Sequence, residues 1–368
     1  MSEDSSQTAH WQPDHLLDRY QLLSIPLGPD PDGEDPITAT LVTKPDSVAA
    51  PRGAVLYVHG FTDYFFHEPL ADFFHDRGFA FYAVDLRKCG RSYADHQTPH
   101  FTTDLTQYDE ELGHALRRVI DELSHAGAPT RVIVAAHSTG GLIAPLWLDR
   151  LRVDDPELHT HIDGLILNSP WLDLQGPPIR RSLPASLLIR AISIAAPKAV
   201  LPQKLSDGYG RSLHDSVGGE WSYDLRIKPL GGFPVKFGFL NAVRTGHARL
   251  HRGIEVGVPA LVLRSTKTVF DTESRGTVDD SDVVLDARQI ARWSASLGNR
   301  VSVEPIPDAR HDVFLSRRPA RDLAYRVAGE WIDRTIPDVA STDTAATADA
   351  AELPADVEKS PISEEAHR

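Results

Sequence analysis

The chain has 368 residues, of which 41% are hydrophobic and 24% charged, and its formal net charge is −14. This composition is typical of a soluble globular protein, and the length allows one large α/β domain or two average ones. Because nucleic acid is a polyanion, a chain this acidic is a poor partner for it, and we expect no nucleic-acid binding. The single cysteine, Cys89, excludes an intrachain disulfide.

Nothing in the sequence predicts a membrane span or a secretory signal. Residues 1–19 form an N-terminal polar segment without a basic region followed by an apolar one. The most apolar stretch, residues 183–201, is interrupted by Arg190 and Lys198, so it does not have the character of a transmembrane helix. We therefore expect a cytoplasmic protein. Residues 336–368 are poor in large apolar side chains, which predicts a disordered acidic tail.

From about Tyr20 onward, short β-rich runs alternate with helical stretches. Residues 20–28 and 37–44 flank a segment of Pro, Asp and Gly residues, which predicts an opening hairpin. Four continuous apolar runs then predict strands that are buried on both faces: 53–60, 79–87, 131–138 and 162–170. Apolar residues at helical spacing between them predict three helices: about 69–78, 104–126 and 140–151.

This alternation stops at Trp171 and resumes after residue 257. The intervening residues are rich in glycine, proline and aromatic side chains, whereas the last part predicts a strand, a helix, a strand and a helix: about 259–265, 286–297, 301–307 and 319–334. The pattern predicts an α/β fold, with a mostly parallel central sheet flanked by helices over 20–170 and 258–335. The insertion 171–257 is expected to be a cap, or lid, over the carboxyl edge of the sheet. Its apolar part, Leu187 to Val200, could line an acyl channel or pack against the core.

The strongest chemical signal is the sequence from Ala136 to Gly141, AHSTGG, between a predicted strand and a predicted helix. A nucleophile elbow needs this context, because a sharp strand-to-helix turn lifts the serine above the sheet. Small residues two positions before and two positions after the serine allow close backbone approach. Ala136 stands where the usual pattern has glycine, which adds one methyl group. A serine in this position could also cap the helix, but the whole pattern predicts Ser138 as a nucleophile.

A second motif, His59-Gly60-Phe61-Thr62, follows the first buried core strand. An oxyanion hole needs two backbone N–H groups directed at one point, and the Phe61 and Thr139 amides are the natural pair. His59 precedes the turn, so we expect it to have a structural role beneath the loop.

The catalytic base should follow the last core strand, which selects His311 among 17 histidines. The acid should lie between the strand at 259–265 and the following helix, where it can orient the base. Asp282 is our first choice and Asp271 the second. Three further aspartates fall in the same region: Asp279, Asp280 and Asp286. Asp286 stands where it would cap the next helix.

The order Ser, Asp, His resembles that of the α/β-hydrolase superfamily, from about Tyr20 to Arg334. More narrowly, the chain resembles the monoacylglycerol lipase and lysophospholipase group in the HGF loop, the HSTGG elbow and the segment from Asp85 to Ser92. That segment usually reads DLRGHGRS, and here Lys88 and Cys89 depart from it. We expect Cys89 to be inert and buried.

The resemblance implies hydrolysis of a carboxylic ester of a small molecule through an acyl-enzyme, with Ser138, His311 and Asp282 as the triad. Amide cleavage, C–C hydrolysis, acyl transfer and a non-catalytic binding role remain open alternatives. The sequence contains no metal-binding or nucleotide-binding motif, so we expect neither a metal nor a cofactor. It is compatible with a monomer or a homodimer.

Overall fold

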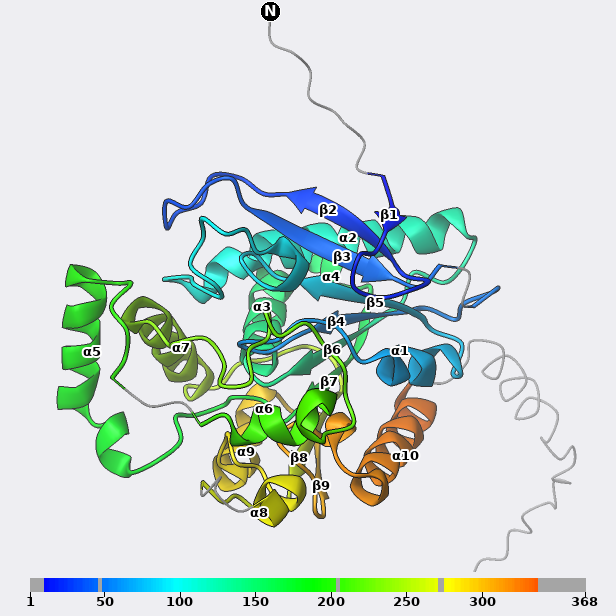
Figure 1. Cartoon of the computed structure of the whole chain (residues 1–368). Helices are drawn as coiled ribbons and strands as arrows, with labels where there is room; N and C mark the ends of the chain where they lie inside the picture. Colours follow the sequence, from blue (N-terminus) through cyan, green and yellow to red (C-terminus); the bar gives the residue numbers. More distant parts are fainter. Residues whose placement is uncertain (1–9, 46–47, 203–205, 271–274, 337–368) are drawn as a thin grey trace, which may run out of the picture.

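A computed structural model of the chain describes residues 10–45, 48–202, 206–270 and 275–336. In these ranges a nine-stranded sheet runs in the order β1-β2-β3-β5-β4-β6-β7-β8-β9, with helices on both sides (Figure 1). The strands are β1 Gln12–Pro13, β2 Gln21–Pro26, β3 Thr38–Thr43, β4 Ala54–Val58, β5 Ala80–Asp85, β6 Val132–His137, β7 Ile162–Asn168, β8 Ala260–Ser265 and β9 Val301–Ile306.

The sheet is antiparallel at its N-terminal edge and parallel elsewhere. Strands β1, β2 and β3 pair antiparallel, as does β3 with β5. Every pair from β5 through β4, β6, β7 and β8 to β9 is parallel. The predicted opening hairpin and the predicted mostly parallel sheet are both confirmed. The carboxyl ends of β6 and its parallel neighbours therefore meet at one edge of the sheet, where ligands bind in such folds.

Helices of the core cover the two faces of the sheet. Helices α2, α3 and α7 contribute to the apolar cluster on one face, and α1 and α10 contribute to the cluster on the other. The helices are α1 Glu68–His75, α2 Tyr108–His125, α3 Gly140–Asp154, α4 Pro156–His159, α5 Leu183–Ala195, α6 Gly208–Leu213, α7 Phe237–Leu250, α8 Arg275–Asp280, α9 Ala287–Trp293 and α10 Arg318–Thr335. None of the helices in the described ranges is both long and apolar enough to cross a membrane.

Strand β4 shows why continuous apolar runs form the centre of this fold. Successive side chains of a strand point to opposite faces of the sheet. Leu56 and Val58 lie in the cluster beneath α2 and α3, whereas Val55 and Tyr57 lie in the cluster beneath α1 and α10. All four are at most 2% exposed. Because helices cover both faces, both sets of side chains must be apolar. Burial of each large apolar side chain stabilises the folded state by roughly 1.5–3 kcal/mol.

The described part of the N-terminal polar segment packs on the core. The Trp11 indole N–H donates to Glu122 of α2 at 2.9 Å, and Asp14 pairs with Arg91 at 2.6 Å. Residues 1–9 and the predicted tail from residue 337 onward lie outside the described ranges.

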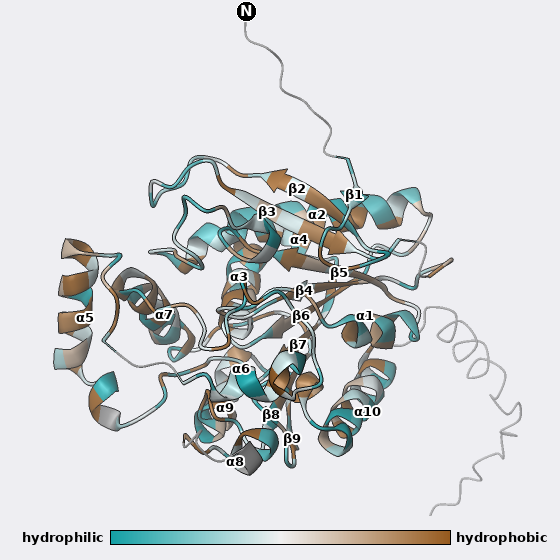
Figure 2. Cartoon of the chain, in the orientation of Figure 1, coloured by the Kyte–Doolittle hydropathy of each residue, from teal (hydrophilic) through white to brown (hydrophobic). Residues whose placement is uncertain are grey.

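The predicted insertion contains α5, α6 and α7 between strands β7 and β8. Helices α5 and α7 lie side by side at one end of the molecule, and much of α5 consists of hydrophobic residues (Figures 1 and 2). Leu187, Leu188, Ile194 and Val200 are exposed by 49–74%. These four side chains are therefore largely exposed, although α5 itself packs against α7.

Candidate active site

Ser138 occupies a strained turn between β6 and α3. Its φ is +52°, in the left-handed region that non-glycine residues rarely adopt. Its backbone N–H donates to the Asn168 carbonyl at 3.0 Å, and its carbonyl accepts from the Trp171 N–H at 2.8 Å. Strand β7 and the start of the insertion thus hold the backbone of Ser138 from both sides. Strain of this kind persists only where the surroundings fix it, which is typical of functional sites.

Glycines next to Ser138 allow the close approach that the turn needs. A Cβ atom on Gly140 would lie 2.5 Å from the His59 carbonyl oxygen, and one on Gly60 would lie 2.9 Å from the Ser138 Cβ. Real Cβ atoms are not found at such distances, so any larger residue would displace the backbone. The HGF loop and the elbow therefore fit together only with glycine at both positions.

His311 lies in the loop between β9 and α10, as the sequence predicts for a base. Its Nε2 atom lies 2.9 Å from the Ser138 Oγ, across 173 residues of chain. Only 3% of its surface is exposed. With Nδ1 donating to a carboxylate, Nε2 is the acceptor for the serine hydroxyl.

Asp282 supplies that carboxylate. Its Oδ2 atom lies 3.0 Å from His311 Nδ1, and its Oδ1 atom accepts from the backbone N–H groups of Val284 and Leu285 at 2.9 and 2.7 Å. The residue is fully buried. Two backbone donors hold the carboxylate in place. The structure thus brings Ser138, His311 and Asp282 into one hydrogen-bonded row.

The other aspartates of this region have different partners. Asp279 pairs with Arg310 and Arg317, and Asp280 pairs with Lys267. The Asp286 side chain accepts from the Arg288 N–H at the start of α9, which confirms the predicted helix cap. Asp271, the second choice for the acid, lies outside the described residues.

The two amides predicted for the oxyanion hole border the same cavity as Ser138. Phe61 and Thr139 both line it. Among the hydrogen bonds of the described residues, none is donated by either backbone N–H. Both donors are therefore available to a ligand.

His59 and Cys89 have the structural roles expected from the sequence. His59 is 1% exposed; its Nδ1 donates to the Gly60 carbonyl at 2.7 Å, and its Nε2 accepts from the Leu86 N–H at 3.1 Å. It thereby fixes the HGF loop onto the segment after β5. Cys89 is 1% exposed, and burial raises the pKa of its thiol, so the reactive thiolate is disfavoured.

A buried charge network beside the site was missed by sequence reasoning. Lys228 of the insertion pairs with Asp63 at 2.6 Å, and Asp63 accepts from His137 Nδ1 at 3.2 Å. Asp312 lies on the other side of that imidazole, at 3.8 Å. Burial acts to lower the pKa of His137, but Asp312 and Asp63 outweigh it and raise the pKa. The only sequence signal was position, because Asp63, His137 and Asp312 each lie within two residues of a predicted site residue.

The opposite effect operates on the Asp63 carboxyl. Burial alone would raise its pKa, yet Lys228 and His137 hold the pKa well below its usual value. The network therefore contains ionised groups next to the serine turn and connects the insertion with the loop that carries Phe61.

A cavity of about 220 Å³ opens onto Ser138 and His311. Its walls come from the HGF loop, from the insertion and from the loop after Asp282. About half of the lining side chains are apolar or aromatic, and the others are polar. The aromatic and large apolar ones are Phe61, Trp171, Tyr209, Leu213, Tyr223, Leu230, Phe233, Val235, Val284 and Leu285, and the polar ones include Asp63, Gln175 and Lys228.

Comparisons with known proteins agree with this architecture. Residues 49–216, less than half of the chain, match the family described as Serine aminopeptidase, S33 (Hydrolase_4). That stretch contains Phe61, Ser138 and Thr139 but neither Asp282 nor His311. No curated protein matches the chain.

Several solved structures share the fold at low sequence identity. A soluble variant of the Saccharomyces cerevisiae monoglyceride lipase, in complex with a substrate analogue, has a TM-score of 0.59 and 15% identity over 89% of this chain and 95% of that one. The Paleococcus ferrophilus monoacylglycerol lipase has a TM-score of 0.58 and 17% identity over 81% of this chain and 98% of that one. The chain therefore has the α/β-hydrolase fold and resembles the monoacylglycerol lipase group.

Proposed function

We propose that this protein is a serine hydrolase that cleaves a carboxylic ester, with Ser138 as nucleophile, His311 as general base and Asp282 as the orienting acid. The hydrogen-bonded row of these three side chains carries the proposal, because it contains the nucleophile, the base and the group that sets the tautomer of the base. The two monoglyceride lipases of similar fold support the same reaction class.

The geometry supports a two-step acyl transfer. His311 Nε2 accepts the Ser138 hydroxyl proton as Oγ attacks the ester carbonyl, and the resulting imidazolium protonates the leaving alcohol. Asp282 holds the charged imidazolium in place. Water, activated by the same imidazole, then hydrolyses the acyl-enzyme and releases the acid.

The negative charge of the tetrahedral intermediate would be held by the Phe61 and Thr139 amides. Their N–H groups have no hydrogen-bond acceptor among the described residues, so no existing bond must break. Helix α3 begins at Gly140, directly after Thr139, and the positive end of its dipole favours an anion there. Each amide of such a hole contributes about 3–4 kcal/mol to the transition state.

The cavity favours a short or medium acyl group. Its volume of about 220 Å³ is below the roughly 300–1,000 Å³ of typical small-molecule sites. We propose that the insertion 171–257 acts as the cap that selects substrate, since Trp171, Tyr209, Leu213, Tyr223 and Phe233 of this segment line the cavity.

The test measures hydrolysis of p-nitrophenyl esters of increasing acyl length by the wild type, Ser138→Ala and Ser193→Ala. Ser193 lies on α5, outside the cavity, and its hydroxyl donates to the Arg190 carbonyl of its own helix. We expect the wild type and Ser193→Ala to hydrolyse the esters, with the highest rate on short or medium acyl chains. We expect intact-mass measurements to detect no acyl-enzyme in Ser138→Ala. Turnover by Ser138→Ala equal to that of the wild type would refute the assignment.

Amide cleavage is the second candidate, because the matching family is described as an aminopeptidase. Rates on a p-nitrophenyl ester and on a p-nitroanilide with the same acyl group separate the two. We expect the ester to be the better substrate by more than its intrinsic reactivity explains. Acyl transfer would show as ester exchange with added alcohol, and C–C hydrolysis as cleavage of a β-diketone. A folded protein inactive on every probe would indicate a binding role.

A further inference from the structure

The last residue of strand β7, Asn168, lies beside the nucleophile. Asn168 is 3% exposed and pairs in register with His137, the residue before Ser138. The backbone carbonyl of Asn168 accepts the Ser138 N–H at 3.0 Å. The backbone of Asn168 therefore holds the nucleophile, and its side chain can act on a different part of the site.

The Asn168 side chain binds both residues that follow the base. Its Nδ2 donates to Asp312 Oδ1 at 2.6 Å, and its Oδ1 accepts the Val313 N–H at 3.1 Å. Asp312 and Val313 are both fully buried. A carboxylate can only accept and a backbone N–H can only donate, so these two partners fix which way the amide points. One side chain thus links the end of β7 to a loop 144 residues further along the chain.

The position of His311 depends on its neighbours in the loop. The backbone N–H and carbonyl of His311 make no hydrogen bond among the described residues. On one side, the Arg310 N–H donates to Ser316 Oγ at 2.9 Å. On the other side, Asn168 holds Asp312. Loss of the Asn168 side chain would therefore release the loop on the side directly after the base.

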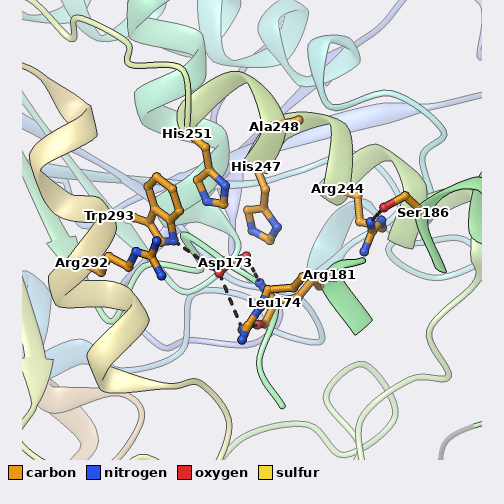
Figure 3. A pocket seen from close by; sticks show the side chains of 10 residues that line it. All are labelled: Asp173, Leu174, Arg181, Ser186, Arg244, His247, Ala248, His251, Arg292 and Trp293. Carbon is orange, nitrogen blue, oxygen red and sulfur yellow. Dashed lines mark hydrogen bonds and ion pairs between the residues drawn. The ribbon is translucent and has the colours of Figure 1, made fainter. Parts of the chain in front are cut away.

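The chain that follows β7 is also held in place. The Trp171 N–H donates to the Ser138 carbonyl at 2.8 Å, and the Trp171 carbonyl accepts from His247 Nε2 of α7 at 2.8 Å. His247 and Asp173 line a second cavity, of about 390 Å³, between α5, α7 and α9 (Figure 3). There the Trp293 indole N–H of α9 donates to the Asp173 carboxylate at 3.3 Å. Helices α7 and α9 thus anchor this segment.

We propose that Asn168 is a positioning residue that sets the distance between the nucleophile and the base. Its backbone holds Ser138 and its side chain holds the loop of His311, so one residue restrains both partners of the 2.9 Å contact between Oγ and Nε2. Proton transfer needs this contact, and a displacement of about 1 Å can lower a rate by roughly 10²-fold. The inference rests on the proposed serine hydrolysis. Asn168 does not line the cavity at Ser138, so it acts through its neighbours.

The test compares the wild type with Asn168→Ala and with a matched control, Gln97→Ala. Gln97 also has a buried amide with two hydrogen bonds: its Nε2 donates to the Pro36 carbonyl at 2.8 Å, and its Oε1 accepts the Ala94 N–H at 3.0 Å. Gln97 does not line the cavity at Ser138. Both substitutions remove two hydrogen bonds, so we expect both to lower the unfolding midpoint.

The measurement is kcat and KM on a p-nitrophenyl ester, divided by the number of reactive serines. Diethyl p-nitrophenyl phosphate supplies that number, because it phosphorylates the serine and releases one p-nitrophenol per site. Unfolded molecules do not react, so a partly unfolded variant can still be measured. We expect kcat per site to fall by about ten- to a hundredfold in Asn168→Ala, with KM within about twofold of the wild type. In Gln97→Ala, both should equal the wild type.

The outcomes separate this inference from the proposed function. A wild-type kcat per site in Asn168→Ala, or an equal fall in Gln97→Ala, would overturn the inference and leave the proposed function intact. A wild type that reacts with neither the phosphate nor an ester would contradict both. If Asn168→Ala yields no reactive sites, Asn168→Ser is measured in the same way. Its single oxygen cannot replace both Oδ1 and Nδ2, so kcat per site should also fall, and a wild-type value would again overturn the inference.

Discussion

Replacing Asp282 by asparagine should abolish most of the activity while leaving the protein folded. The carboxylate accepts from two backbone N–H groups through Oδ1 and from His311 through Oδ2. In asparagine, the carbonyl oxygen must face the two backbone donors, because the NH₂ group cannot accept from them. That orientation points the NH₂ group at His311 Nδ1, which must then become the acceptor.

The consequence is the wrong tautomer of the base. With Nδ1 as acceptor, Nε2 carries the proton and can no longer take one from Ser138. The same substitution in a serine protease triad lowers kcat by about 10⁴-fold, and we expect a similar loss here, equivalent to about 5 kcal/mol. The assay is kcat on the best p-nitrophenyl ester, with the unfolding midpoint as the folding check.

Asp286→Asn is the matched control for this prediction. Asp286 lies four residues further on and only caps α9, a role that asparagine fills equally well. We expect its kcat to equal that of the wild type. A kcat for Asp282→Asn within tenfold of the wild type would refute the reasoning, and a large loss in Asp271→Asn instead would make that residue the acid.

Three further predictions concern stability. Lys228→Met should destabilise the protein by about 3 kcal/mol in urea unfolding, because it removes the cation that compensates the buried Asp63 charge and leaves Asp63 only its contact with His137; adding Asp63→Asn should restore part of this, and a fully additive loss would contradict the pairing. Gly60→Ala should lower the free energy of unfolding by about 1–3 kcal/mol and should also lower kcat. The control is Gly113→Ala on α2, where the new Cβ would meet only the Arg117 side chain, and it should not lower the free energy of unfolding. Burial lowers the pKa of His247 to about 3. Between about pH 6.5 and 3, therefore, only the unfolded chain binds a proton at this residue. The free energy of unfolding is then highest, with respect to this group, above about pH 6.5 and decreases as the pH falls. The unfolding free energy of His247→Gln in phosphate-free buffer should therefore depend less on pH than that of the wild type, and parallel curves would contradict this.

Local patterns predicted most of the core and the row of site residues. Strand β4 and its parallel neighbours are continuous apolar runs because both of their faces are covered by other elements. A run of this kind can be recognised from the sequence alone. Ser138 could be placed because it directly follows a strand, and His311 because it lies in the loop after the last strand. The choice of Asp282 rested on the same logic, although several aspartates competed for the role.

The features that sequence reasoning missed depend on contacts between distant segments. Lys228 and Asp63 are 165 residues apart, and no periodicity links them. The cavity between α7 and α9 is also formed by packing of elements distant in the chain. Likewise, α5 has the composition of a buried helix, yet Leu187 and Leu188 face outward. Charge pairs, cavities and helix orientation are properties of tertiary packing, which overrides local preference.

The length of chain between Ser138 and His311 has a consequence for refolding. The elbow belongs to one strand–helix unit, whereas its base and acid follow β9 and β8, so the Ser138–His311 hydrogen bond closes a loop of 173 residues. We expect the base and the acid to reach the elbow only after β8 and β9 have joined the edge of the sheet. Long loops close late and slowly. The rate at which esterase activity returns during refolding should therefore report when the C-terminal strands join the sheet. Far-ultraviolet circular dichroism should report the helices, which we expect to form earlier.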